Sequence, residues 1–92
     1  MNLEILIRKL CYYGQSHSRI YNLLGYNNEV IKKTNTIKSK IISNYVRNGT
    51  NTIIYDYLRF GIETDIPYDI KSELDELRNE ILEFRKEVIL NE

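Results

Sequence analysis

Apolar residues recur along the first part of the chain with the spacing of helices rather than of strands. Within residues 2–13 they fall at i, i+3, i+4 and i+7, on the positions Leu3, Leu6, Ile7 and Leu10. Gly14 suits the end of such a helix, because glycine readily adopts the left-handed backbone that follows many helices. The pattern therefore predicts a first amphipathic helix over residues 2–13.

A second and a third helix follow after short breaks. Ser16 is a good N-cap for a helix that reaches Leu24, and Gly25 stops it. Its inner face consists of Ile20, Leu23 and Leu24. The third helix begins at Asn27 or Asn28, since either side chain can cap it.

The apolar stripe of the third helix is interrupted. Val30 and Ile31 face inward, residues 32–36 are all polar, and apolar residues resume at Ile37, Ile41 and Ile42. Two alternatives fit this pattern. One is a long helix that projects a polar face outward, and the other is a break at residues 34–36.

Residues 41–57 also allow two structures. β-Branched and aromatic residues are frequent here, and Asn48-Gly49 is a strong short signal for a hairpin turn. We therefore favour a β-hairpin with strands at residues 43–47 and 50–55. In the alternative, all-α structure, Gly49 ends one helix and Asn51 caps a short helix that holds Ile53, Ile54, Tyr57 and Leu58.

A heptad repeat dominates the C-terminal segment. Pro67 and the acids Asp69 and Glu73 indicate a helix start, and the helix is expected over residues 67–90. Its a positions are Leu74, Ile81 and Val88, and its d positions are Ile70, Leu77 and Phe84. This spacing predicts a parallel two-stranded coiled coil, and hence a homodimer. The alternative is a stripe that folds back on the first helix within one chain.

Charges beside the stripe agree with the parallel coiled coil. Glu73 and Glu80 occupy g positions, and Arg78 and Arg85 occupy the following e positions. In a parallel pair each glutamate faces an arginine of the partner. The expected organisation is thus mainly α: a head of residues 1–62 and an acidic dimerisation helix of residues 63–92.

Composition and the N-terminal residues together predict a soluble, cytoplasmic protein. The chain has 92 residues, of which 42% are hydrophobic and 28% charged, an ordinary globular balance. No apolar run reaches the length of a transmembrane helix, so no membrane association is expected. The N-terminus lacks a basic region followed by a long apolar stretch, and we expect no secretory signal.

The zero net charge conceals an asymmetry between the halves. Residues 1–49 carry eight basic and two acidic side chains, which sum to +6, and residues 50–92 carry five basic and eleven acidic side chains, which sum to −6. A basic half suits a polyanionic partner, whereas segregation by chance would leave only a solvated surface.

The stretch from Gly14 to Ile31 resembles the helix-turn-helix family. The matching positions are Gly14, Ser16, Ile20, Leu24, Gly25 and Ile31. In that family such apolar residues hold two helices at a steep angle, and the second of them enters the major groove of DNA. Glu29 departs from the family pattern, because an acid near the start of the third helix faces phosphate.

With the predicted hairpin, the order of elements is similar to that of winged-helix proteins, among them PadR-type regulators and plasmid partition or transfer-accessory proteins. The resemblance implies double-stranded DNA as the partner. It implies phosphate contacts from Ser16, Ser18 and Arg19, groove contacts from Asn28, Lys32, Lys33, Asn35, Thr36, Ser39 and Lys40, and a wing tip at Arg47 and Asn48.

Nothing in the sequence indicates an enzyme or a cofactor. Cys11 is the single cysteine and His17 the single histidine, so neither a disulfide nor a metal site is expected. No phosphate-binding loop or nucleophile arrangement is present, and we expect no small-molecule substrate. The alternative function is a phage or viral protein-interaction module, or a nucleic-acid mimic, that acts on a partner protein through its acidic C-terminal helix.

Overall fold

The structure is a computed structural model that describes residues 2–38 and 49–90, with side chains as far as residue 88. The described residues form five α-helices and one short 3-10 helix: α1 (Leu3–Tyr12), α2 (His17–Leu24), α3 (Asn28–Lys38), α4 (Thr50–Phe60), η1 (Tyr68–Ile70) and α5 (Lys71–Leu90). The expectation of a mainly helical fold is confirmed. No described helix is both long enough and apolar enough to cross a membrane.

The first two helices lie where the sequence predicts them, within one residue at each end. Asn2 caps α1, because its side-chain oxygen accepts from the amides of Glu4 and Ile5. Ser16 caps α2 by accepting from the amide of Arg19 at 3.3 Å. Gly25 ends α2 with a φ of +104°, a backbone conformation that other residues rarely adopt.

The predicted hairpin wing is wrong, because its second strand is the helix α4. Gly49 adopts a left-handed backbone immediately before this helix and does not form a hairpin turn. In a helix Thr50, Ile54 and Leu58 lie on one face, and all three are buried. This burial outweighs the β propensity of the segment. The predicted first strand, together with Ser39, Lys40, Arg47 and Asn48, lies outside the described residues.

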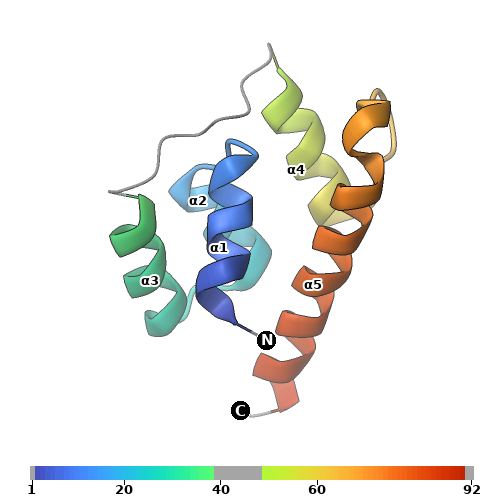
Figure 1. Ribbon diagram of the computed structural model, residues 1–92. Helices are drawn as coiled ribbons and strands as arrows, with labels where there is room; N and C mark the ends of the chain where they lie inside the picture. Colours follow the sequence, from blue (N-terminus) through green and yellow to red (C-terminus); the bar gives the residue numbers. More distant parts are fainter. Residues whose placement is uncertain (1, 39–48, 91–92) are drawn as a thin grey trace.

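The helices surround one continuous apolar core. In Figure 1, α3 lies along one side of the molecule and α5 along the other, with α1 and α2 between them. α3 packs on α1 and α2, whereas α5 packs on α1, α2 and α4. Buried residues from α1 to α5 form a single cluster. The core therefore extends across position 62, where the head and the C-terminal helix were expected to separate.

The heptad stripe of α5 is buried within a single chain. Ile70, Leu74, Leu77 and Ile81 are at most 7% exposed. Phe84 is partly buried against the same cluster, and Val88 is half-buried. The four buried side chains have almost no free surface for a second helix, so the predicted coiled-coil interface is wrong for most of this stripe. The alternative is correct, since the stripe folds back on its own chain.

The glutamates beside the stripe bind α1. Glu73 accepts a hydrogen bond from the hydroxyl of Tyr13. Glu80 accepts from the Lys9 ammonium at 2.8 and 3.0 Å. These two glutamates of the heptad pattern therefore have their partners in the same chain.

The arginines on the other side of the stripe bind the carboxyl ends of two helices. Arg78 donates from Nε to the Tyr57 carbonyl of α4 at 3.1 Å. Arg85 donates to the Asn22 and Leu23 carbonyls of α2 at 3.4 and 3.3 Å. Cations are favourable there, because helix carboxyl ends carry unpaired carbonyls and partial negative charge. The predicted pairing of these arginines with glutamates of a partner chain is thus wrong.

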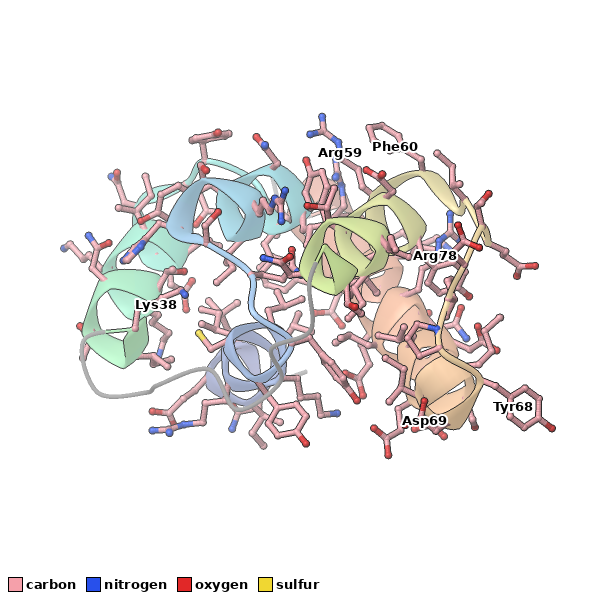
Figure 2. All side chains as sticks on the ribbon, turned by 90° about the horizontal axis from the view of Figure 1, so that it is seen from above. Lys38, Arg59, Phe60, Tyr68, Asp69 and Arg78 are labelled. Carbon is pink, nitrogen blue, oxygen red and sulfur yellow. The ribbon has the colours of Figure 1, made fainter. Side chains whose placement is uncertain are left out.

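The turn after α4 lies against the side chain of Arg78. Figure 2 shows Arg78 between α4 and the connector of residues 61–67. Gly61 ends α4 with a φ of +74°. A Cβ at this position would lie 3.0 Å from Nη2 of Arg78. A larger residue would therefore disturb both the turn and the arginine that caps the helix.

Polar contacts also hold the connector of residues 61–67 against α5. Lys71 forms ion pairs with Glu63 at 3.2 Å and with Asp75 at 2.5 Å. The Lys71 ammonium, followed by the hydroxyl of Tyr57, lowers the pKa of the Asp75 carboxyl. Since Lys71 and Asp75 also contact the Tyr57 side chain, this cluster joins the end of α4 to the start of α5.

The turn between α1 and α2 is attached to α4 by a buried amide. Gln15 is completely buried, and its Nε2 donates to the carbonyls of Tyr13 and Asn51 at 3.1 and 3.0 Å. Buried donors that lose such partners cost about 1–3 kcal/mol. This side chain thus fixes the position of α4 relative to the first two helices.

Leu77→Ala should destabilise the monomer itself. The side chain is 2% exposed, and truncation of a buried leucine costs about 2–5 kcal/mol. Urea denaturation followed by circular dichroism measures this loss. The unfolding midpoint of the wild-type protein should not change with protein concentration. A midpoint that rises with concentration would mean that the stripe is stabilised by a second chain, contrary to the structure.

Candidate nucleic-acid interface

α2 and α3 are joined by a turn of residues 25–27. Asn27 caps α3, because its Oδ1 accepts from the amide of Val30 at 3.0 Å. This selects Asn27 over Asn28 as the cap. The buried residues at the junction are Ile20, Leu23, Leu24 and Val30. Ile31, expected as a main contact, is only half-buried, and Val30 takes its place.

The polar stretch of α3 does not interrupt the helix. α3 continues through residues 34–36 to Lys38, so the predicted alternative of a break is wrong. Thr34 is completely buried and bridges the interval between Val30 and Ile37 on the inner face. A polar residue at an inner position concealed the regular apolar stripe from the sequence pattern.

The outer face of α3 carries five of the residues predicted to contact DNA. Asn28, Lys32, Lys33, Asn35 and Thr36 are all exposed. Lys32, Lys33 and Thr36 line a shallow hollow between α3 and Glu4 of α1. The structure thus brings these exposed side chains together on α3, a helix at the outer side of the molecule in Figure 1.

Asn35 is held in place by a residue that the sequence did not single out. The hydroxyl of Tyr21 in α2 donates to Oδ1 of Asn35 at 2.8 Å. The Tyr21 ring also packs against Tyr26 in the turn, with centroids 5.6 Å apart. The sequence carried only a weak signal for this contact, a tyrosine next to the buried Ile20. Tyr21 is therefore a positioning residue for the outer face.

The predicted phosphate contacts at the start of α2 divide into two groups. Ser16 and Ser18 are exposed, with their hydroxyl oxygens 3.3 Å apart. Arg19 turns toward α4, where its Nη2 donates to Oγ1 of Thr52 at 3.0 Å. Arg19 therefore lies with α4 and apart from the two serines.

Basic and acidic side chains are in excess on opposite sides of the molecule. α3 carries Lys32, Lys33 and Lys38 against the single acid Glu29. Among the described residues these three lysines form no ion pair. α5, on the opposite side in Figure 1, carries six acidic and four basic side chains. The asymmetry between the two halves of the sequence is thus also a spatial asymmetry.

Other chemistry has little support in the described residues. No three His, Cys, Asp or Glu side chains of that part of the chain gather in a way that could hold a metal ion. Cys11 is buried, and burial raises the pKa of its thiol. Comparison with protein-family models, with curated proteins and with solved structures finds no match to this chain.

Asn27→Ala should destabilise the fold by about 1 kcal/mol, because the amide of Val30 loses its cap. Asn28→Ala is the matched control: it removes the same side chain from an exposed position one residue later. Thermal unfolding measures both. Equal losses in the two variants would show that Asn27 does not cap α3.

Proposed function

We propose that this protein binds double-stranded DNA by inserting the outer face of α3 into the major groove. The observation that carries the proposal is the set of exposed lysines and amides on α3, which is braced from behind by α1 and α2. This arrangement of α2, the turn and α3 is similar to a helix-turn-helix unit, in which the second helix reads the groove.

The dimensions and chemistry of α3 suit this role. Its 11 residues span about 16 Å at 1.5 Å per residue, and a helix fits a groove that is about 12 Å wide. Asn35 suits adenine, because an amide can both accept from and donate to its base edge. Lys32 and Lys33 suit guanine oxygens or phosphates. Because Tyr21 already fixes Asn35, less conformational entropy is lost on binding.

Three acidic side chains of α5 have partners within the chain, which favours this proposal over the alternative of a nucleic-acid mimic. Glu73, Asp75 and Glu80 bind Tyr13, Lys71 and Lys9 of the same chain. A mimic that used these acids would first have to break internal contacts. The proposal also requires no dimer, since the α5 stripe belongs to the core of one chain.

Lys32→Ala should weaken binding to a mixed-sequence duplex and reduce its dependence on salt. Each phosphate contact contributes about 0.9 to the slope of log K against log salt concentration, so the slope should fall by about 1. Fluorescence anisotropy at about 50 and 200 mM salt measures both quantities.

The matched control is Lys86→Ala, which removes an exposed lysine from α5 on the opposite side of the molecule. It should leave both the affinity and the salt slope close to those of the wild type. Equal effects of the two substitutions would indicate unspecific attraction to the whole protein. Loss of binding in Lys86→Ala alone would place the interface on α5 and contradict the proposal.

A further inference from the structure

A second basic surface lies between α2 and α4, where Arg19 of α2 and Arg59 of α4 stack with two aromatic rings. The guanidinium of Arg19 lies 5.2 Å from the centroid of the Tyr55 ring. The guanidinium of Arg59 lies 5.9 Å from the Tyr55 centroid and 5.1 Å from that of Phe60. We call these four residues, Arg19, Tyr55, Arg59 and Phe60, the arginine–aromatic stack.

Neutral partners hold both arginines of the stack. Arg19 donates to the hydroxyl of Thr52, and Arg59 donates from Nη1 to the hydroxyl of Tyr55 at 2.5 Å. Within residues 2–38 and 49–88 neither guanidinium forms an ion pair. Asp56 is half-buried on α4 and offsets one of the two positive charges, so the net charge of this surface is +1. The two charges are thus fixed in orientation and available to an anion.

Phe60 adds an exposed ring to this charged surface. Its side chain is 58% exposed although it is fully apolar. Figure 2 shows Phe60 and Arg59 side by side at one edge of the molecule, directed away from the bundle. A base can stack on such a ring while neighbouring guanidiniums bind the phosphates.

We propose that the arginine–aromatic stack binds single-stranded nucleic acid, with an unpaired base on Phe60 and phosphates on Arg59 and Arg19. In a duplex, neighbouring base pairs cover both faces of each base, so Phe60 would have no base to stack on. Unpaired bases are free to stack, and every base has a suitable face. This activity is separate from the duplex contact of α3 and extends beyond it.

Phe60→Trp makes the contact directly visible, because the wild-type chain contains no tryptophan. Stacking of a base should quench the fluorescence of this indole when oligothymidylate of about 16 nucleotides is added. Tyr68→Trp is the matched control. Tyr68 is 96% exposed and lies at a different edge in Figure 2, so its replacement should show no quenching. Quenching in neither variant, or equally in both, would overturn the proposal.

Affinity measurements separate this surface from α3. Phe60→Ala should weaken oligothymidylate binding by about 5- to 100-fold, and Arg59→Gln should lower the salt slope by about 0.7. Both substitutions should leave duplex affinity unchanged, and Lys32→Ala should leave oligothymidylate affinity unchanged. Oligouridylate is tested in parallel. The oligonucleotide that binds more tightly shows whether the stack prefers RNA or DNA. If Phe60→Ala weakens only the binding of duplex, α4 belongs to the duplex interface and the proposal is refuted.

Discussion

Burial of one side of α5 is the constraint on which the rest of the structure depends. The stripe that includes Leu74, Leu77 and Ile81 closes the core against α1, α2 and α4. A chain of 92 residues buries a smaller fraction of its surface than a larger domain does, and without this helix its core would be thin. Arg78 and Arg85 then donate to carbonyls at the carboxyl ends of α4 and α2, so α5 both covers the core and binds the ends of two of the helices beneath it.

Much of the fold could be predicted from local patterns, and the rest depended on tertiary contacts. The caps at Ser16 and Gly25 and the apolar stripes of α1 and α2 are properties of short segments, and they were predicted correctly. The heptad stripe of α5 was also recognised correctly, but its partner was not. A stripe with apolar and charged positions in heptad register is equally suited to three helices of its own chain and to one helix of another.

The segment that precedes α5 shows how burial can outweigh propensity. β-Branched residues and Asn48-Gly49 favoured a hairpin, yet Ile54 and Leu58 reach the core only when residues 50–60 are helical. The candidate site was predicted in part, since the outer face of α3 follows from its polar positions. The contacts of Tyr21 with Asn35 and of Arg19 with α4 could not be predicted from local patterns. They join residues of different helices that are 14 and 33 positions apart in the sequence.

We propose separate roles for opposite sides of the molecule, with α3 as the surface that binds duplex DNA and α5 as the helix that closes the core. NMR spectra of the ¹⁵N-labelled protein during titration with a mixed-sequence duplex test this most directly, because each backbone amide reports its own surroundings. We expect the largest salt-sensitive shifts in residues 28–38, with residues 71–88 nearly unchanged. Shifts concentrated in α5, with α3 unchanged, would show that α3 is not the surface that binds duplex DNA.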